Sequence, residues 1–163
     1  YKEILIEGEE AAPTEEEALF FELRSGVLEL LFAESTWEEA FAAIRKSYGL
    51  SKEGFDPLPL YRDMPHLYPS WEDVLAGFST AHPPMPDMPV RRLCAYFVHR
   101  HLSGGFTDGR WRARLAFCLH ATEVICRLTP TPADFPETAR RYSEEIEYSE
   151  ENLETLLSAL SDI

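Results

Sequence analysis

Apolar residues recur every three or four positions through most of the chain, which is the spacing of an amphipathic α-helix. The clearest run follows Thr14, which has Glu17 three residues later and so forms a capping box, the usual start of a helix. The run predicts a helix over 15–34, with an apolar stripe made of Leu19, Phe20, Leu23, Val27, Leu30 and Leu31. Gly26 lies in its middle and allows a kink. The preceding residues 3–6, EILI, fit either a short strand or the tail of another element.

The same start signal returns twice further along the chain. Thr36 precedes Glu39 in STWEEAFAAIRKSYG and predicts a second helix that stops at Gly49. Its apolar stripe consists of Trp37, Phe41, Ile44 and Tyr48. In PSWEDVLAGF, Ser70 takes the place of the capping threonine and Asp73 that of the glutamate, so a third helix is expected there.

Two proline-rich segments separate these helices from the rest of the chain. Segments 54–69 and 79–89 each hold several prolines, and the residue before a proline is driven toward extended geometry. Both are therefore expected to be irregular, and their many apolar residues should pack them onto the helices as connectors. The alternatives are a proline-rich ligand for another protein's aromatic groove, or a lid over a pocket.

Two long helices are predicted next, over 90–103 and over 108–128, joined by a turn at Gly104 and Gly105. Thr107 or Asp108 is the expected cap of the second. Apolar residues cover two adjacent stripes of 108–128, so this helix should contact neighbours on two sides and lie at the centre of the fold. A helix over 133–147 and a last helix capped by Ser149 complete the chain.

The pattern predicts an all-α fold, an irregular bundle of six or seven helices with two proline-rich connectors. The 163 residues have the length of one ordinary domain, so 1–163 is expected to be a single domain. No apolar run is long enough to cross a membrane. The chain begins at Tyr1 without the order of a secretory signal, which favours a longer parent chain that has been truncated or has a disordered extension before Tyr1.

Charge and cysteine content narrow the possible functions. The net charge is −14, and only the stretch 91–128 is basic, with seven arginines against two acids. An acidic chain repels nucleic acid and anionic lipid, so nucleic-acid partners are not expected. The odd number of cysteines, Cys94, Cys118 and Cys126, within helical patterns suits free thiols in the cytoplasm. A zinc site using them with His120 lacks a C-x-x-C pair, and no metal or other cofactor is expected.

Two histidines, His99 and His101, stand one residue apart in CAYFVHRHLSGGF and suggest a metal site at first sight. On a helix, however, residues two apart point about 200° away from each other, so the two rings cannot share an ion. His101 continues the apolar stripe and is expected to be partly buried with a hydrogen-bond partner. His99 is expected on the polar side.

The basic stretch offers candidate ligand-binding residues, Arg100, Arg110 and Arg114, since guanidinium groups suit carboxylates and phosphates. The spacing of the arginines in 108–128 spreads them over different faces, and acidic stretches elsewhere can neutralise them. Internal ion pairing is therefore the favoured interpretation. A small anionic ligand and a nucleic-acid backbone are the alternatives.

His120 and Glu123 form an H-x-x-E pair on one helix face, the reverse of the E-x-x-H order used in di-iron bundles, and only one such pair is present. No catalytic residue is assigned in the favoured interpretation. In the alternative in which the protein is an enzyme, the candidates are His101, His120 and Glu123, with His120 and Glu123 as a general acid-base pair. Glycine-rich phosphate loops and the G-x-S-x-G, H-E-x-x-H and EF-hand motifs are absent from the sequence.

The sequence therefore favours a soluble cytoplasmic, non-enzymatic protein that works through protein–protein contact or self-association. The first alternative is a small enzyme or anionic-ligand-binding domain with a pocket between 90–103 and 108–128. The second is nucleic-acid binding through the arginine-bearing helices.

Overall fold

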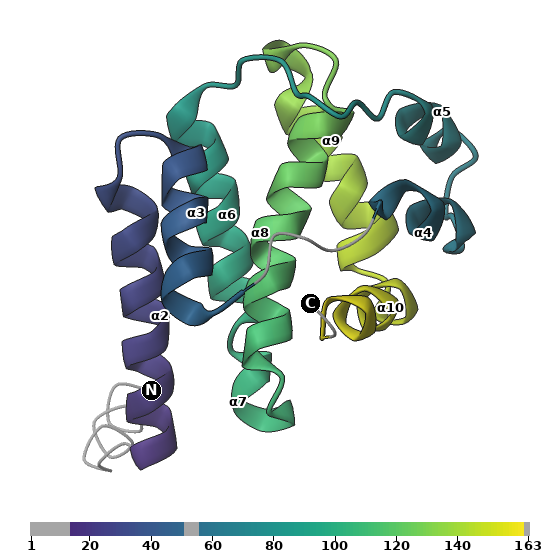
Figure 1. The fold of residues 1–163 in the computed structure, drawn as a ribbon. Helices are drawn as coiled ribbons and strands as arrows, with labels where there is room; N and C mark the ends of the chain where they lie inside the picture. The colour runs from purple at the N-terminus through teal and green to yellow at the C-terminus, as the bar shows by residue number, and fades with distance from the viewer. Residues whose placement is uncertain (1–13, 51–55, 162–163) are drawn as a thin grey trace, which may run out of the picture.

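The computed structural model describes residues 14–50 and 56–161 (Figure 1). These residues form nine α-helices, a short 3-10 helix and a π-helical turn, and they contain no β-strand. The all-α expectation is confirmed, whereas the expected number of six or seven helices was too low. The EILI segment, residues 3–6, lies outside the described residues.

The helices follow one another with short connections. They are α2 (Glu15–Ala33), α3 (Trp37–Tyr48), α4 (Pro57–Asp63), α5 (Trp71–Ala76), α6 (Asp87–His101), α7 (Gly104–Asp108), α8 (Trp111–Leu128), α9 (Phe135–Tyr142) and α10 (Glu150–Ser161). A 3-10 helix, Pro132–Asp134, precedes α9, and a π-helical turn, Ser143–Glu147, follows it.

Threonine caps begin α2 and α3 as the sequence predicts. The hydroxyl oxygens of Thr14 and Thr36 accept hydrogen bonds from the backbone N–H of Glu17 and Glu39, each at 3.1 Å. The expected stop at Gly49 is also present, because this residue adopts a left-handed conformation with φ of 66°. The expected cap at Ser70 is wrong: no side-chain bond caps α5, and the Ser70 hydroxyl accepts from Arg141 instead.

Segment 54–69 contains helix α4, so its expected irregular structure is wrong for these residues. Pro57 occupies the first turn, where a backbone N–H has no partner inside the helix, and proline therefore costs little there. The carboxylate of Asp56 accepts from the N–H of Leu58 at 3.1 Å and caps the helix. The second proline-rich segment has no helix over 79–86, as expected, and α6 begins at Asp87.

Two further boundaries differ from the expectation. The turn at Gly104 and Gly105 folds into the short helix α7, and α8 begins only at Trp111. The expected helix over 133–147 is divided, because the chain widens into the π-helical turn, with the N–H of Tyr148 donating to the carbonyl of Ser143 at 2.9 Å.

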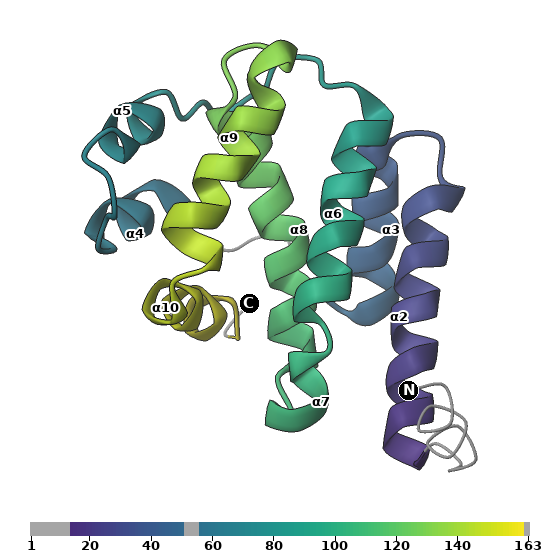
Figure 2. The same cartoon turned by 180° about the vertical axis from the view of Figure 1, so that it is seen from behind.

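Helix α8 lies at the centre, as its two apolar stripes predict. Figures 1 and 2 show α2, α3 and α6 on one side of it and α9 and α10 on the other. Eleven residues of α8 are buried, and the buried apolar side chains of the described residues belong to one cluster. In the part of the chain that is described, no helix has the length and apolar character that a membrane span requires.

Candidate functional site

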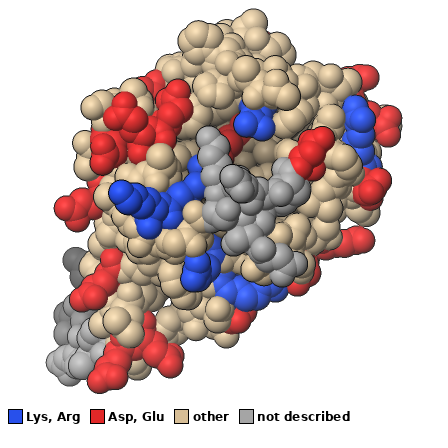
Figure 3. Space-filling view, in the orientation of Figure 1, with Lys and Arg blue, Asp and Glu red and all other residues tan. Residues whose placement is uncertain are grey.

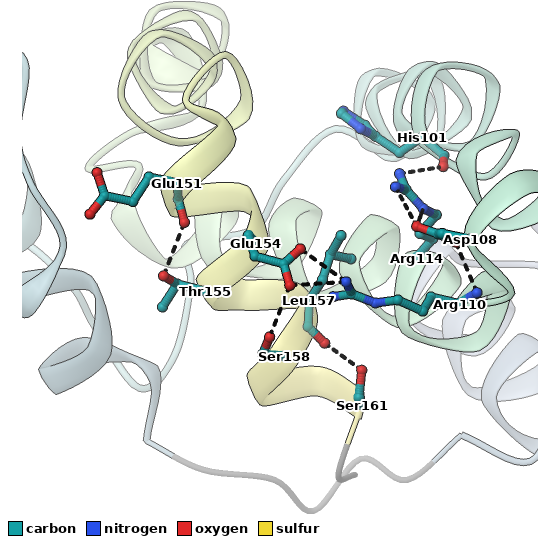
Figure 4. A network of polar contacts seen from close by, with 10 residues as sticks. All are labelled: His101, Asp108, Arg110, Arg114, Glu151, Glu154, Thr155, Leu157, Ser158 and Ser161. Atoms are coloured by element: carbon teal, nitrogen blue, oxygen red, sulfur yellow. Dashed lines mark hydrogen bonds and ion pairs between the residues drawn. The ribbon is translucent and has the colours of Figure 1, made fainter.

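Two of the three candidate ligand-binding arginines, Arg110 and Arg114, lie at the start of α8 and have partners inside the molecule (Figure 4). Arg110 pairs with Glu154 of α10 at 2.9 Å. Arg114 pairs with Asp108 at 2.8 Å and also donates to the carbonyl oxygen of His101 at 3.2 Å. These contacts agree with internal ion pairing, and they join the ends of α6, α7, α8 and α10.

The third arginine, Arg100, and His101 both contact the carboxylate of Glu147 in the π-helical turn. The distances are 2.9 Å from Arg100 Nε and 2.6 Å from His101 Nε2 to the same oxygen of Glu147. The hydroxyl of Tyr96 donates to the same carboxylate at 3.0 Å. The expected helical geometry is confirmed here, since His101 is buried and His99 is exposed.

The electrostatics of this cluster favour an ionised carboxylate. Burial alone would raise the pKa of Glu147, but hydrogen bonds from His101, Ser143 and Tyr96 hold the pKa of Glu147 below its usual value. The side chains of Glu147 and His101 are 0% and 7% exposed, whereas that of Arg100 is 51% exposed. The cluster joins α6 to the π-helical turn.

His120, the second candidate catalytic residue, lies on α8 against a pair of tyrosines. Its Nε2 atom is 3.0 Å from the hydroxyl of Tyr61, which in turn is 2.6 Å from the hydroxyl of Tyr142. Burial, together with the positive charges of Arg45 and Arg127, lowers the pKa of His120 to about 4. The imidazole is therefore neutral at physiological pH.

Glu123, the third candidate, pairs with Arg45 of α3 through both carboxylate oxygens. The three candidates thus have three different partners: His101 contacts the π-helical turn, His120 contacts α4 and Glu123 contacts α3. Between 90–103 and 108–128, where a pocket is one of the expected alternatives, the ring centroids of Phe97 and Phe117 lie 5.9 Å apart and both residues are fully buried, so side chains fill this part of the interface.

The cysteines have no arrangement suited to chemistry or to zinc. Cys94, Cys118 and Cys126 are free and buried, and burial raises the pKa of Cys94 and of Cys126 to about 12. A reactive or metal-binding cysteine needs its thiolate form. Within 14–50 and 56–161, no three His, Cys, Asp or Glu side chains are grouped so as to hold a metal ion.

An open, largely apolar groove lies beside α2. This helix carries nine large apolar residues, but only Val27 and Leu31 are buried. Between α2, α7 and the start of α8 lies a groove of about 390 Å³, which we call the α2–α7 groove. Its lining consists of Glu16, Leu19, Phe20, Leu23, Gly105, Phe106 and Trp111.

A glycine shapes the far wall of this groove. A side-chain Cβ at Gly105 would lie 2.5 Å from the Cα of Trp111, so only glycine lets α7 fold back onto the start of α8. This packing places the ring of Phe106 6.2 Å from that of Phe20. The sequence predicts an apolar stripe on this helix that includes Leu19, Phe20 and Leu23, but it does not show which of these residues α7 leaves uncovered.

The chain matches no protein-family model, no curated protein and no solved structure. Its function must therefore be inferred from its own geometry. The candidate polar residues are used in contacts within the fold, whereas the α2–α7 groove is open and apolar.

Proposed function

We propose that this protein is a non-enzymatic protein–protein interaction module whose α2–α7 groove binds a basic amphipathic helix of a partner protein. The observation that carries the proposal is the exposure of apolar side chains along the groove, of which Leu19 on α2 and Phe106 on α7 are 65% and 38% exposed. A helix that is apolar on most of its circumference is stable in water only when most of it is covered. Contiguous exposed apolar surface of this kind is typical of a docking site.

Charge selects the kind of partner. Helix α2 contains five glutamates and one arginine, and Glu16 lines the groove itself. A partner helix with lysine or arginine beside its apolar stripe would neutralise these carboxylates. A second copy of this chain would bring the same glutamates together, so the observations favour a different protein over self-association.

The other two functions that the sequence allows have weaker support. Arg100, Arg110 and Arg114 are used in internal ion pairs, so these three arginines are less available for a nucleic acid or a phosphate. We also propose that the protein folds as one domain, supported by its single buried cluster. Its free buried cysteines support a cytoplasmic location.

The experiment compares two synthetic peptides of leucine and lysine with identical composition, one arranged in amphipathic heptads and one scrambled. Fluorescence anisotropy should show tighter binding of the amphipathic peptide. The double variant Leu19→Ser/Phe106→Ser should weaken that binding roughly tenfold or more, because both side chains line the groove. Tyr148→Ser removes an exposed aromatic ring outside the groove and is the control, expected to bind as the wild type.

Two results would contradict this proposal. Equal affinity for the scrambled peptide would show that net charge alone drives binding. A concentration-dependent dimer in sedimentation experiments that is lost in the double variant would show that a second copy occupies the groove.

A further inference from the structure

A separate pocket of about 290 Å³ lies between α3 and α8, away from the α2–α7 groove, and we call it the α3–α8 pocket. Three segments that are distant in the sequence supply its lining. They contribute Trp37, Glu38, Ala42 and Arg45 from α3, Leu50 just after it, His82 from the connector 79–86, and Glu123 and Arg127 from α8. The connector is fixed to α8 by a hydrogen bond from Ser79 N–H to the carbonyl of Arg127 at 3.1 Å.

One pair of charges in this pocket is already neutralised. Arg45 and Glu123 pair through two hydrogen bonds, with side chains only 14% and 27% exposed. A bidentate pair of this kind fixes the guanidinium plane and uses both carboxylate oxygens. Arg45 is therefore not free to bind an anion, and the pair contributes no net charge.

The other two charges have no ionic partner. Within residues 14–50 and 56–161, Arg127 contacts the ring of Phe78 at 5.8 Å but no carboxylate, and Glu38 pairs with no cation. Figure 3 shows Lys and Arg toward the middle of the face seen in Figure 1 and most Asp and Glu near its rim. The α3–α8 pocket thus combines one available positive charge with one available negative charge.

An aromatic wall completes the pocket. The buried ring of Trp37 lies 5.1 Å from the imidazole of His82. Nδ1 of His82 is 2.7 Å from the carbonyl oxygen of Pro83, which can only accept, so Nδ1 is the donor. This bond fixes the ring of His82 beside Trp37. The backbone of Trp37 is fixed in turn, because its backbone N–H donates to the carboxylate of Asp87 at 2.7 Å.

We propose that the α3–α8 pocket binds a small zwitterion with one carboxylate and one ammonium group, of which a free α-amino acid is the simplest example. Arg127 binds the carboxylate, Glu38 binds the ammonium group, and Trp37 with His82 contacts the apolar side chain. A simple anion would gain Arg127 but face Glu38, whereas a ligand with zero net charge and separated charges can contact Arg127, Glu38 and the two rings together. This activity goes beyond the docking function proposed for the α2–α7 groove.

The experiment uses L-phenylalanine and two analogues that each lack one charge, 3-phenylpropionate without the amine and phenethylamine without the carboxylate. Isothermal titration calorimetry should show that L-phenylalanine binds roughly tenfold or more tightly than either analogue. Its binding should also shift the NMR signal of the Trp37 indole.

Variants locate the two charged contacts. Glu38→Gln should weaken binding of L-phenylalanine to the level of 3-phenylpropionate and leave 3-phenylpropionate itself no weaker. Arg127→Met should weaken binding of L-phenylalanine, whereas phenethylamine should bind at least as tightly as it does to the wild type. Arg92→Met, at an exposed position on α6, is the matched control and should bind as the wild type.

Three results would overturn the proposal. One is equal affinity for L-phenylalanine and 3-phenylpropionate in the wild type. Another is unchanged L-phenylalanine binding in the folded Glu38→Gln and Arg127→Met variants. The last is absence of binding by both L-phenylalanine and L-leucine at millimolar concentration.

Discussion

His101 and His120 have different charged neighbours in the fold. His101 lies beside the buried carboxylate of Glu147, which is ionised because several hydrogen bonds converge on it. His120 lies between Tyr61 and two arginines, where burial and positive charge disfavour its protonated form. At the scale of single residues, then, both candidate catalytic histidines are explained by contacts within the fold.

The lowered pKa of His120 predicts a pH dependence of stability. The unfolded chain binds a proton at this residue near its ordinary pKa of 6.5, whereas the folded protein binds it only near 4. Acidification from pH 6.5 toward 4 therefore favours the unfolded state, by up to about 3 kcal/mol at this one site.

Urea unfolding of the wild type at several pH values should show this decrease between pH 6.5 and 5, above the range in which carboxylates are protonated. His120→Gln should reduce the slope in this interval, and the exposed His99→Gln should leave it unchanged. An equal slope in the wild type and His120→Gln would contradict the assignment.

At the scale of elements, helix starts depend on whether the capping side chain reaches the first turn. The motifs at Thr36 and Ser70 have similar sequences, yet only Thr36 accepts a backbone hydrogen bond from its helix. Ser70 already has helical φ and ψ of −63° and −14°, whereas an N-cap residue is normally extended. The capping motif therefore marks both helices but stabilises only one of them through its hydroxyl.

This difference gives a matched pair of variants. Thr36→Ala should lower the free energy of unfolding by about 1 kcal/mol, because it removes the hydrogen bond to the N–H of Glu39. Ser70→Ala should change it by less than about 0.5 kcal/mol, since the Ser70 hydroxyl bonds to Arg141 at the surface and not to the first turn of α5. Equal losses in urea denaturation would show that the cap geometry is not the cause.

At the scale of the whole molecule, α8 is the axis around which the other helices pack, and α2 is the least covered of the long helices. Leu115 of α8 is fully buried, whereas Leu19 of α2 is 65% exposed. The same residue type therefore serves the core at one position and, as we propose, a partner at the other.

Leu115→Ala should lower the free energy of unfolding by about 2 to 5 kcal/mol, because it opens a cavity in the core. Leu19→Ala should change it by less than about 0.5 kcal/mol in the isolated protein. Thermal and chemical denaturation of both variants measures the difference. A large loss in Leu19→Ala would mean that the groove is closed in solution and would count against the docking proposal.

The sequence by itself determined the helical class, the boundaries of α2 and α3, and the central position of α8. These features follow from local periodicity and from capping bonds between residues close in the chain, which each segment forms by itself. The short helices α4 and α7 do not follow from the sequence pattern, because prolines and glycines usually interrupt a helix. Proline, however, is tolerated in a first turn, and Gly105 is required by the packing of α7 against Trp111.

Only the tertiary structure decided the roles of the candidate site residues. The partner of Arg100, His101, Glu123 and Arg110 is in each case an acid or base distant in the sequence, so helical spacing cannot identify it. The α2–α7 groove and the α3–α8 pocket likewise depend on which side chains neighbouring helices cover. Burial and ion pairing are properties of the assembled fold, and a one-dimensional pattern of polar and apolar residues does not contain them.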